Sequence, residues 1–357
     1  RREQALQDVP VAITAVGTEF LQERQITSID RLSSLAPNVL ITTGHNNSSS
    51  SQISIRGSTT INTNILYDPS VATYLDGVYI GKAYGSIFDI NDLERVEVLR
   101  GPQGTLFGRN TLAGAVSLVT RKPGPQFRAE AEFTYGAYDD RRARGLINVP
   151  LTDNLFIKVA AQLQFRDGYT DFVRDPNGGV PDVFLTNDGA DNRNRKSGQV
   201  QVRWQPTSDL TFDYAYDISR IREHPLAALD SFGPAGGVTP PGVPLISLFP
   251  GLETYLANGR RPKTISTNVG YDERSKVYGH ALNVELALGD ATVKSITSYR
   301  KLKYKWRVND LDGTPFAIAA GAQDSRYHQF SQELQLSGDL WGDRINYVVG
   351  AFYFEDS

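Results

Sequence analysis

The sequence contains neither cysteine nor methionine among its 357 residues. The lack of cysteine excludes a disulfide framework, a thiolate metal site and a cysteine nucleophile. The chain starts at Arg1, with no initiator methionine and no signal peptide. We therefore expect it to be a processed or truncated piece of a longer protein.

Histidine is also scarce. The four histidines are His45, His224, His280 and His328, and no HxH or HExxH spacing joins them. Spacings of that kind are what a helical or strand-borne metal site shows in sequence, so no metal ligand is predicted. No Ser/His/Asp arrangement is readable either, and we expect neither an enzyme nor a bound cofactor.

An excess of one charge and a long apolar run are both missing. Lys and Arg number 37 against 40 Asp and Glu, a net charge of −3, which argues against binding to nucleic acid through a basic face. The mean hydropathy is −0.34, and no apolar run reaches the ~18 residues of a membrane helix. A helical membrane protein is excluded. A membrane β-barrel is not, because its strands alternate polar and apolar residues.

Residues 1–125 contain short elements of mixed type. We expect helices at 19–25 and 27–36, and strands at 9–16, 52–56, 71–80, 95–99 and 114–120. The strand region 71–80 should fold back on itself at Asp76-Gly77, a dipeptide typical of a tight hairpin. The polar run 44–51 has no apolar face to bury, and it predicts an exposed loop.

From residue 126 onward the pattern changes to long strands with a period of two. In residues 156–165, Ile157, Val159 and Leu163 share one face while Lys158 and Gln162 share the other. The same alternation occurs in 200–204 and 210–218. Strands of about ten residues suit a membrane crossing better than the usual five or six.

The connections between these strands alternate in length. Short turns at 150–154, 206–209, 289–290 and 337–339 are separated by long loops near 167–196, 223–275 and 308–325, and the first hairpin, at 138–141, is also short. A barrel with short turns on one rim produces this rhythm, whereas a soluble β-sandwich has no reason to sort its loops in this way.

The strand count is about nine. A bacterial single-chain barrel needs an even number of strands and a closed wall. We therefore predict a mixed α+β domain at 1–125, followed at 126–357 by the N-terminal part of an antiparallel transmembrane β-barrel.

The run RVEVLRGPQGTLFGRN at residues 95–110 resembles the plug signature of TonB-dependent outer-membrane receptors. Residues 1–10, 55–57, 75–78 and 114–120 are similar to further parts of that plug. The resemblance implies a plug domain inside a barrel of 22 strands, a size at which barrels are plugged. The TonB box that should precede Arg1 and more than half of the barrel are absent from the chain.

The resemblance also implies a function. Members of this family import a scarce ligand, such as a ferric siderophore, across the outer membrane of Gram-negative bacteria. They work with TonB, ExbB and ExbD and use the inner-membrane proton-motive force. Vitamin B12, haem, other metal chelates and glycans remain open as ligands. An adhesive, structural or signalling outer-membrane receptor without transport is the alternative.

Candidate site residues follow from the same resemblance. In the family, plug loops at the places of 45–51, 60–69 and 81–88 form apices that touch the ligand. The ligand-binding candidates are His45, Asn46, Asn47, Asn62, Asn64, Tyr67, Asp68, Tyr84 and Phe88. The plug–barrel candidates are Arg56, Arg100 and Arg109, paired with Glu285 and Glu333 or with carboxylates in the missing strands, because a buried charge needs a partner.

Two further partners are expected. The apolar strand faces should contact outer-membrane lipid. In the loop 223–275, residues 225–229 and 244–250 are apolar for a segment outside the cell, and exposed apolar patches often mark a binding surface. This loop is either a lid or a contact for a surface partner, or it folds back over the barrel mouth.

Overall fold

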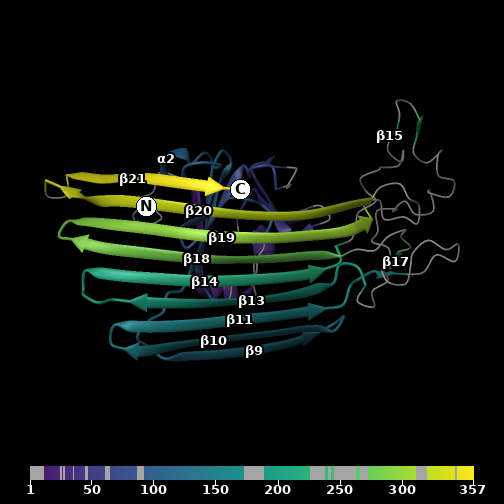
Figure 1. Ribbon diagram of the computed structural model, residues 1–357, viewed down its shortest axis with the longest axis horizontal. Coiled ribbons are helices and arrows are strands. Elements are labelled where there is room, and N and C mark those ends of the chain that lie inside the picture. Colours follow the sequence, from purple (N-terminus) through teal and green to yellow (C-terminus); the bar gives the residue numbers. More distant parts are fainter. Residues whose placement is uncertain are drawn as a thin grey trace.

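Two layers make up the fold: a small mixed domain and a sheet of long strands that passes along one side of it (Figure 1). The computed structural model describes residues 12–24, 26, 29–34, 36–44, 47–60, 65–86, 92–172, 189–225, 238–239, 243–244, 263–265, 272–310, 320–341 and 344–357. Among these residues, no helix is long and apolar enough to cross a lipid bilayer.

The first domain is built on two small sheets. One has the order β1-β7-β8-β5-β6, with β5 parallel to β8 and the other pairs antiparallel. The other has the order β2-β3-β4. The elements are β1 (Ala12–Gly17), α1 (Thr18–Glu23), η1 (Ile29–Ser34), β2 (Val39–Gly44), β3 (Asn47–Ile55), β4 (Ser58–Thr59), β5 (Val71–Leu75), β6 (Val78–Ile80), β7 (Leu93–Arg100), α2 (Gly104–Phe107) and β8 (Gly114–Thr120).

The hairpin expected at Asp76-Gly77 joins β5 to β6. Both residues have positive φ, +50° and +86°, as a type I′ turn requires. The Asp76 carboxylate accepts hydrogen bonds from the backbone N–H and the hydroxyl of Thr120, at 2.9 and 2.6 Å. The turn is therefore fixed to the end of β8.

Apolar side chains between the two sheets form the domain's main core. Ile29, Leu32, Ile41, Ile55 and Leu118 are each at most 2% exposed and belong to one cluster. The helix expected at 27–36 is the 3₁₀ helix η1, which supplies the first two of these residues. Its apolar residues dock against β2, so packing rather than length holds it.

Nine antiparallel strands form the second layer, and their number confirms the expected count. The strands are β9 (Arg128–Gly136), β10 (Asp140–Thr152), β11 (Leu155–Arg166), β13 (Arg193–Trp204), β14 (Leu210–Glu223), β18 (Glu273–Leu288), β19 (Ala291–Asp310), β20 (Ala320–Leu340) and β21 (Ile345–Asp356). β9 and β21 are the outer strands of this sheet, which is not closed among the described residues. Four two-residue strands lie elsewhere: β12 (Asp171–Phe172), β15 (Val238–Thr239), β16 (Val243–Pro244) and β17 (Thr264–Ile265).

Apart from the first hairpin, the short turns of the nine-stranded sheet lie at one end. The β10–β11, β13–β14, β18–β19 and β20–β21 connections are all on the left in Figure 1, and the β9–β10 hairpin is on the right. This is the arrangement that the alternation of turn and loop lengths predicts. The sheet therefore has a short-turn end and a long-loop end. We call this nine-stranded sheet the wall.

The two faces of the wall differ as expected. On β11, Lys158 and Gln162 face the small domain and are 1% and 3% exposed, whereas Val159 and Leu163 point away and are each 41% exposed. A polar inner face and an apolar outer face are the pattern of a barrel that stands in a membrane and encloses a polar lumen.

Candidate functional site between the plug-like domain and the wall

The serine-rich run is buried, which contradicts the expected exposed loop. β3 begins at Asn47, and Ser48, Ser49, Ser50 and Ser51 are at most 6% exposed. The prediction assumed that only an apolar face can be buried. Here the wall is itself polar, and it supplies hydrogen-bond partners to backbone groups that would otherwise need water.

Glu273 of the wall holds the start of this strand. Its two carboxylate oxygens accept hydrogen bonds from the backbone N–H groups of Ser48 and Ser49, at 2.7 and 3.2 Å. Beside it in the sheet register is Glu223, which pairs with Arg195 at 2.7 Å and with Arg193 at 2.8 Å. The Arg195 guanidinium also donates to the Ser48 carbonyl, at 3.4 Å.

The two carboxyl groups have different electrostatic surroundings. Both lie at the long-loop end of their strands, beyond the apolar outer stretch 278–288 of β18 that is long enough to cross a bilayer. Burial, together with the nearby charge of Glu223, raises the pKa of Glu273 to about 7. Burial acts in the same direction on Glu223, but Arg195 and Arg193 outweigh it and lower its pKa to about 2.

A second contact lies nearer the short-turn end. Asp92 is 8% exposed and accepts from Lys158 of β11 at 2.8 Å and from Arg128 of β9 at 2.6 Å. Lys158 also donates to the carbonyl of Arg121. Close by, the Gln201 side chain donates to the Thr120 hydroxyl at 2.7 Å. One buried carboxylate of the small domain therefore joins two strands of the wall.

A third contact joins β6 to β20. The side chain of Gln329 donates to the Tyr79 carbonyl at 2.7 Å and accepts from the Gly81 N–H at 2.9 Å. A Cβ atom on Gly81 would lie 2.6 Å from the hydroxyl of Tyr327, closer than Cβ atoms normally approach, so the lack of a side chain here suits the contact. The Gln329 side chain thus satisfies a backbone carbonyl and a backbone N–H at the free edge of β6.

Among the three predicted arginines, Arg109 is the one that contacts the wall within the described residues. It pairs with Asp68 at 2.7 Å, and its guanidinium carbon lies 4.8 Å from the centre of the Phe354 ring on β21. Arg56 is exposed, with a φ of +53°, and Arg100 is half-buried on β7.

The two predicted wall carboxylates contact other wall residues. Glu285 lies 3.5 Å from Lys294, and Glu333 accepts from Gln335. In this structure neither meets Arg56, Arg100 or Arg109. Other wall residues contact the small domain instead, among them Glu273, Lys158 and Gln329.

The predicted ligand-binding residues divide into three groups. Residues outside the described part of the chain are His45, Asn46, Asn62, Asn64 and Phe88. Asn47 is 3% exposed, and its side-chain oxygen accepts from the N–H groups of Ser49 and Ser50. Tyr84 stacks on Tyr304 of the wall, with ring centres 4.6 Å apart. Asn47 therefore holds the backbone at the start of β3, and Tyr84 packs against the wall.

Tyr67 and Asp68 are both exposed. The Tyr67 side chain is 54% exposed. Asp68 accepts from Lys82 at 2.9 Å and from Arg109 at 2.7 Å. These two are the described ligand candidates that a bound molecule could reach.

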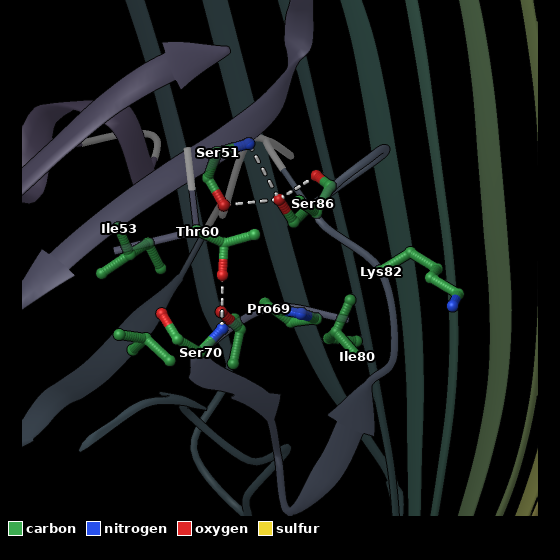
Figure 2. Close-up of a pocket in the computed structure, with 11 residues that line it drawn as sticks. Ser51, Ile53, Thr60, Pro69, Ser70, Ile80, Lys82 and Ser86 are labelled. Atoms are coloured by element: carbon green, nitrogen blue, oxygen red, sulfur yellow. Dashed lines mark hydrogen bonds between the residues drawn. The ribbon is translucent and has the colours of Figure 1, made fainter. Parts of the chain in front are cut away.

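A small cavity lies within the small domain, lined among others by Ser51, Thr60, Ser70 and Ser86 (Figure 2). Its polar groups bond to one another: the hydroxyls of Ser51 and Ser86 are 2.6 Å apart, and the Ser70 N–H donates to the Thr60 hydroxyl at 2.8 Å. Lys82 extends from the cavity toward the wall, where its Nζ lies 3.6 Å from Asp356. The groups around the cavity join segments of the small domain to one another. The cavity is too small to hold a ligand.

Two other sequence expectations are addressed only in part. The apolar residues 226–229 and 245–250 of the long loop, expected to form a lid or a contact surface, lie outside the described residues. Within the described part of the chain, no three His, Asp or Glu side chains are grouped as metal ligands.

The small domain is similar to a known protein domain. The family model of the TonB-dependent receptor plug domain matches residues 5–115. The pesticin receptor of Yersinia enterocolitica is 28% identical over 211 residues, which cover 59% of this chain and 29% of the receptor. The vitamin B12 transporter BtuB of Vibrio vulnificus is 25% identical over 214 residues, covering 57% of this chain and 34% of the transporter.

The whole described arrangement also has a counterpart among solved structures. The ferric yersiniabactin uptake receptor FyuA of Yersinia pestis superposes with a TM-score of 0.77 at 21% identity. The match covers 97% of this chain and 48% of FyuA. The two therefore share a fold, and this chain spans about half of the solved receptor and about a third of the curated relatives.

Proposed function

Because this chain belongs to the TonB-dependent receptors of the Gram-negative outer membrane, we propose that the intact protein is an active transporter that imports a scarce ligand. Residues 1–125 form its plug and residues 126–357 the first part of its barrel. The partners in this proposal are TonB, ExbB and ExbD on the periplasmic side and a small ligand on the outer side.

The observation that carries the proposal is the polar contact between plug and wall. Glu273, Lys158 and Gln329 hold the plug by hydrogen bonds and ion pairs at three levels of the wall. Such groups can exchange a protein partner for water at a small net cost, whereas an apolar interface cannot. This supports a plug that is held firmly and can still rearrange.

Ligand binding must favour the rearranged state for transport to follow. A ligand that binds both states equally shifts nothing, however tightly it binds. Tyr67 and Asp68 are suited to sense it, because Asp68 is linked through Lys82 and Arg109 to Asp356 and Phe354 of β21. A ligand that draws Asp68 away would loosen this corner of the plug.

A ferric siderophore or a similar metal chelate is the proposed ligand class. Two similar proteins support it: FyuA is a ferric yersiniabactin uptake receptor and BtuB a vitamin B12 transporter. Such ligands are large and carry carbonyl, hydroxyl and aromatic groups. Exposed Tyr67 and the amides of Asn62 and Asn64 offer complementary hydrogen bonds and ring contacts.

The test is uptake by the intact protein. A strain that lacks its own siderophore receptors is given the full-length gene and is supplied with a panel of radiolabelled ferric siderophores and cobalamin. We expect accumulation of one ligand class that stops when TonB is deleted or when the proton-motive force is collapsed. Binding without TonB-dependent accumulation of any ligand would contradict transport and would support the adhesive or signalling alternative.

A further inference from the structure

A continuous row of positive side chains crosses five adjacent strands of the wall. In the strand register, Lys196 of β13 lies opposite Arg220 of β14, which lies opposite Lys276 of β18. Lys276 lies opposite Lys303 of β19, which in turn lies opposite Arg326 of β20. Neighbouring strands are ~4.8 Å apart, so the row is about 19 Å long.

The row faces away from the plug. Successive side chains of a strand point to opposite faces. Arg195 reaches the plug at the Ser48 carbonyl, so the adjacent Lys196 points outward. Glu273 and Gln329 likewise contact the plug, and Lys276 and Arg326 have the opposite parity on the same strands. Lys196, Arg220, Lys303 and Arg326 are exposed, and Lys276 is half-buried.

The row has no counter-charge in the described part of the wall. None of its five side chains forms an ion pair with a described carboxylate, although the neighbouring Arg274 and Lys305 do, with Asp272 and Asp324. Like charges directly opposite one another destabilise a sheet. The outward position of Lys276 and Lys303 therefore costs stability unless an anion from outside the chain lies between them.

The position of the row along the strands, relative to the membrane, indicates which anion this is. Four residues further along, toward the short-turn end, four of the five strands carry an aromatic row in register: Tyr216, His280, Tyr299 and Phe330. Aromatic side chains gather at the boundary between hydrocarbon and headgroups. Four residues of a strand tilted by about 40° rise ~10 Å, which places the positive row at the level of the lipid headgroups.

We propose that Lys196, Arg220, Lys276, Lys303 and Arg326 bind the phosphate groups of the phosphorylated glycolipid in the outer leaflet. Ammonium and guanidinium groups form charge-assisted hydrogen bonds with phosphate, and arginine can bind it through two parallel bonds. A row of about 19 Å contacts more than one phosphate at once. A lipid headgroup with two phosphates matches this length, whereas a free phosphate matches only one or two strands.

The experiment uses the intact receptor, purified in mild detergent, with lipid A carrying both phosphates as the probe. Bound lipid is counted by native mass spectrometry across a lipid titration. The test variant carries Arg220→Gln, Lys276→Gln and Lys303→Gln together. We expect it to bind lipid A about 100-fold more weakly, since each basic side chain near such a surface contributes about a factor of five. Raising the salt concentration should weaken binding to the wild-type protein in the same direction.

The matched control lies on the same strand. Lys303→Gln alone and Lys294→Gln remove the same charge from β19, but Lys294 faces inward beside Glu285. We expect about fivefold weaker binding for the first and no change for the second. A shift of the band on gels run with and without boiling confirms that each variant is folded.

Three results would overturn the proposal. The triple variant could bind lipid A as tightly as the wild type, lipid A without its phosphates could bind equally well, or millimolar inorganic phosphate could displace the lipid completely. The first two would show that phosphate groups do not lie on this row. The third would assign the row to free phosphate instead of lipid.

Discussion

The carboxylate of Glu273 in the barrel wall accepts a hydrogen bond from the backbone N–H of Ser48 in the plug, at 2.7 Å. The two residues are 225 positions apart in the sequence, and both are buried. The wall thus provides an acceptor for the start of β3, where residues 47–51 are all polar. Docking of the plug against the wall therefore satisfies backbone groups at the start of this strand.

Replacing Glu273 by alanine should weaken that docking. The change leaves the N–H group of Ser48 buried without its acceptor, which costs about 1–3 kcal/mol, and leaves the Ser49 N–H with the Asn47 side chain alone. We expect faster hydrogen exchange over 47–55 in the intact receptor, with little change over β7 and β8. Glu285→Ala is the matched control, because Glu285 faces the same side of β18 and pairs with Lys294. Equal exchange in the two variants would contradict the role of Glu273.

Plug docking should also depend on pH through Glu273. Its pKa in the docked state is raised to about 7 by burial and by the charge of Glu223, so docking favours the protonated group. The stabilisation is complete below the ordinary pKa of about 4.5 and is lost as the pH rises through 7. Spin labels on the plug and the wall, measured by pulsed electron paramagnetic resonance, should give a wider distribution of label-to-label distances at pH 8 than at pH 5.

Glu273→Gln separates this effect from other titrations. Glutamine keeps one acceptor oxygen and cannot ionise, so the distance distribution of this variant should be the same at both pH values. Glu223 stays charged throughout, because Arg195 and Arg193 hold its pKa near 2. A pH response that persists in Glu273→Gln would assign the titration to a different group.

Asp92→Asn should destabilise the contact of Asp92 with Lys158 and Arg128, near the short-turn end of the wall, by about 3 kcal/mol. The substitution removes the charge that neutralises Lys158, which is 1% exposed, and a buried unpaired charge is costly. Pulse proteolysis in urea measures the change in the free energy of plug release. Adding Lys158→Met to Asp92→Asn should recover part of the loss, because methionine fills a similar volume without a charge. Removing the exposed Lys294–Glu285 pair should change stability by less than 1 kcal/mol.

Gly81→Ala should push the plug away from β20. The new Cβ atom would meet the Tyr327 hydroxyl at 2.6 Å and the side chain of Gln329 at 3.1 Å. Overpacking of this kind typically costs 1–3 kcal/mol. Gly124→Ala is the control, since nothing lies within 4 Å of a Cβ there. Urea midpoints of plug release should fall for Gly81→Ala alone, and equal midpoints would show that the contact at Gln329 adapts without loss.

Local chemistry in the sequence predicts most of the fold. The Asp76-Gly77 turn, the strand at 114–120 and the nine long strands follow from turn preferences and from a period of two, both of which act over a few residues. The sorting of short turns to one end also follows, because a strand of known length places each connection at a known end.

The contacts between plug and wall could not be predicted in the same way. Ser48 and Glu273 meet only when the wall curves around the plug, and no local pattern records that pairing. Polarity alone made the serine-rich run look exposed, because the expectation of a polar lumen was not applied to it. Lys158 carried a usable signal: a charged residue inside a long membrane strand must face a partner across the lumen. Glu285 carried the same signal, but its partner is Lys294 on the next strand.

The order β1-β7-β8-β5-β6 has a mechanical consequence. β1 stands at one edge of its sheet and is joined to it by a single ladder, the pairing of Ala12–Gly17 with 95–100 of β7. A force on the chain before Ala12 loads this ladder before any other. When it yields, the four-stranded remainder keeps all its own pairings. β1 can therefore detach without disrupting the other strands. The stability of the β1–β7 pairing determines whether a pulling force reaches the rest of the plug.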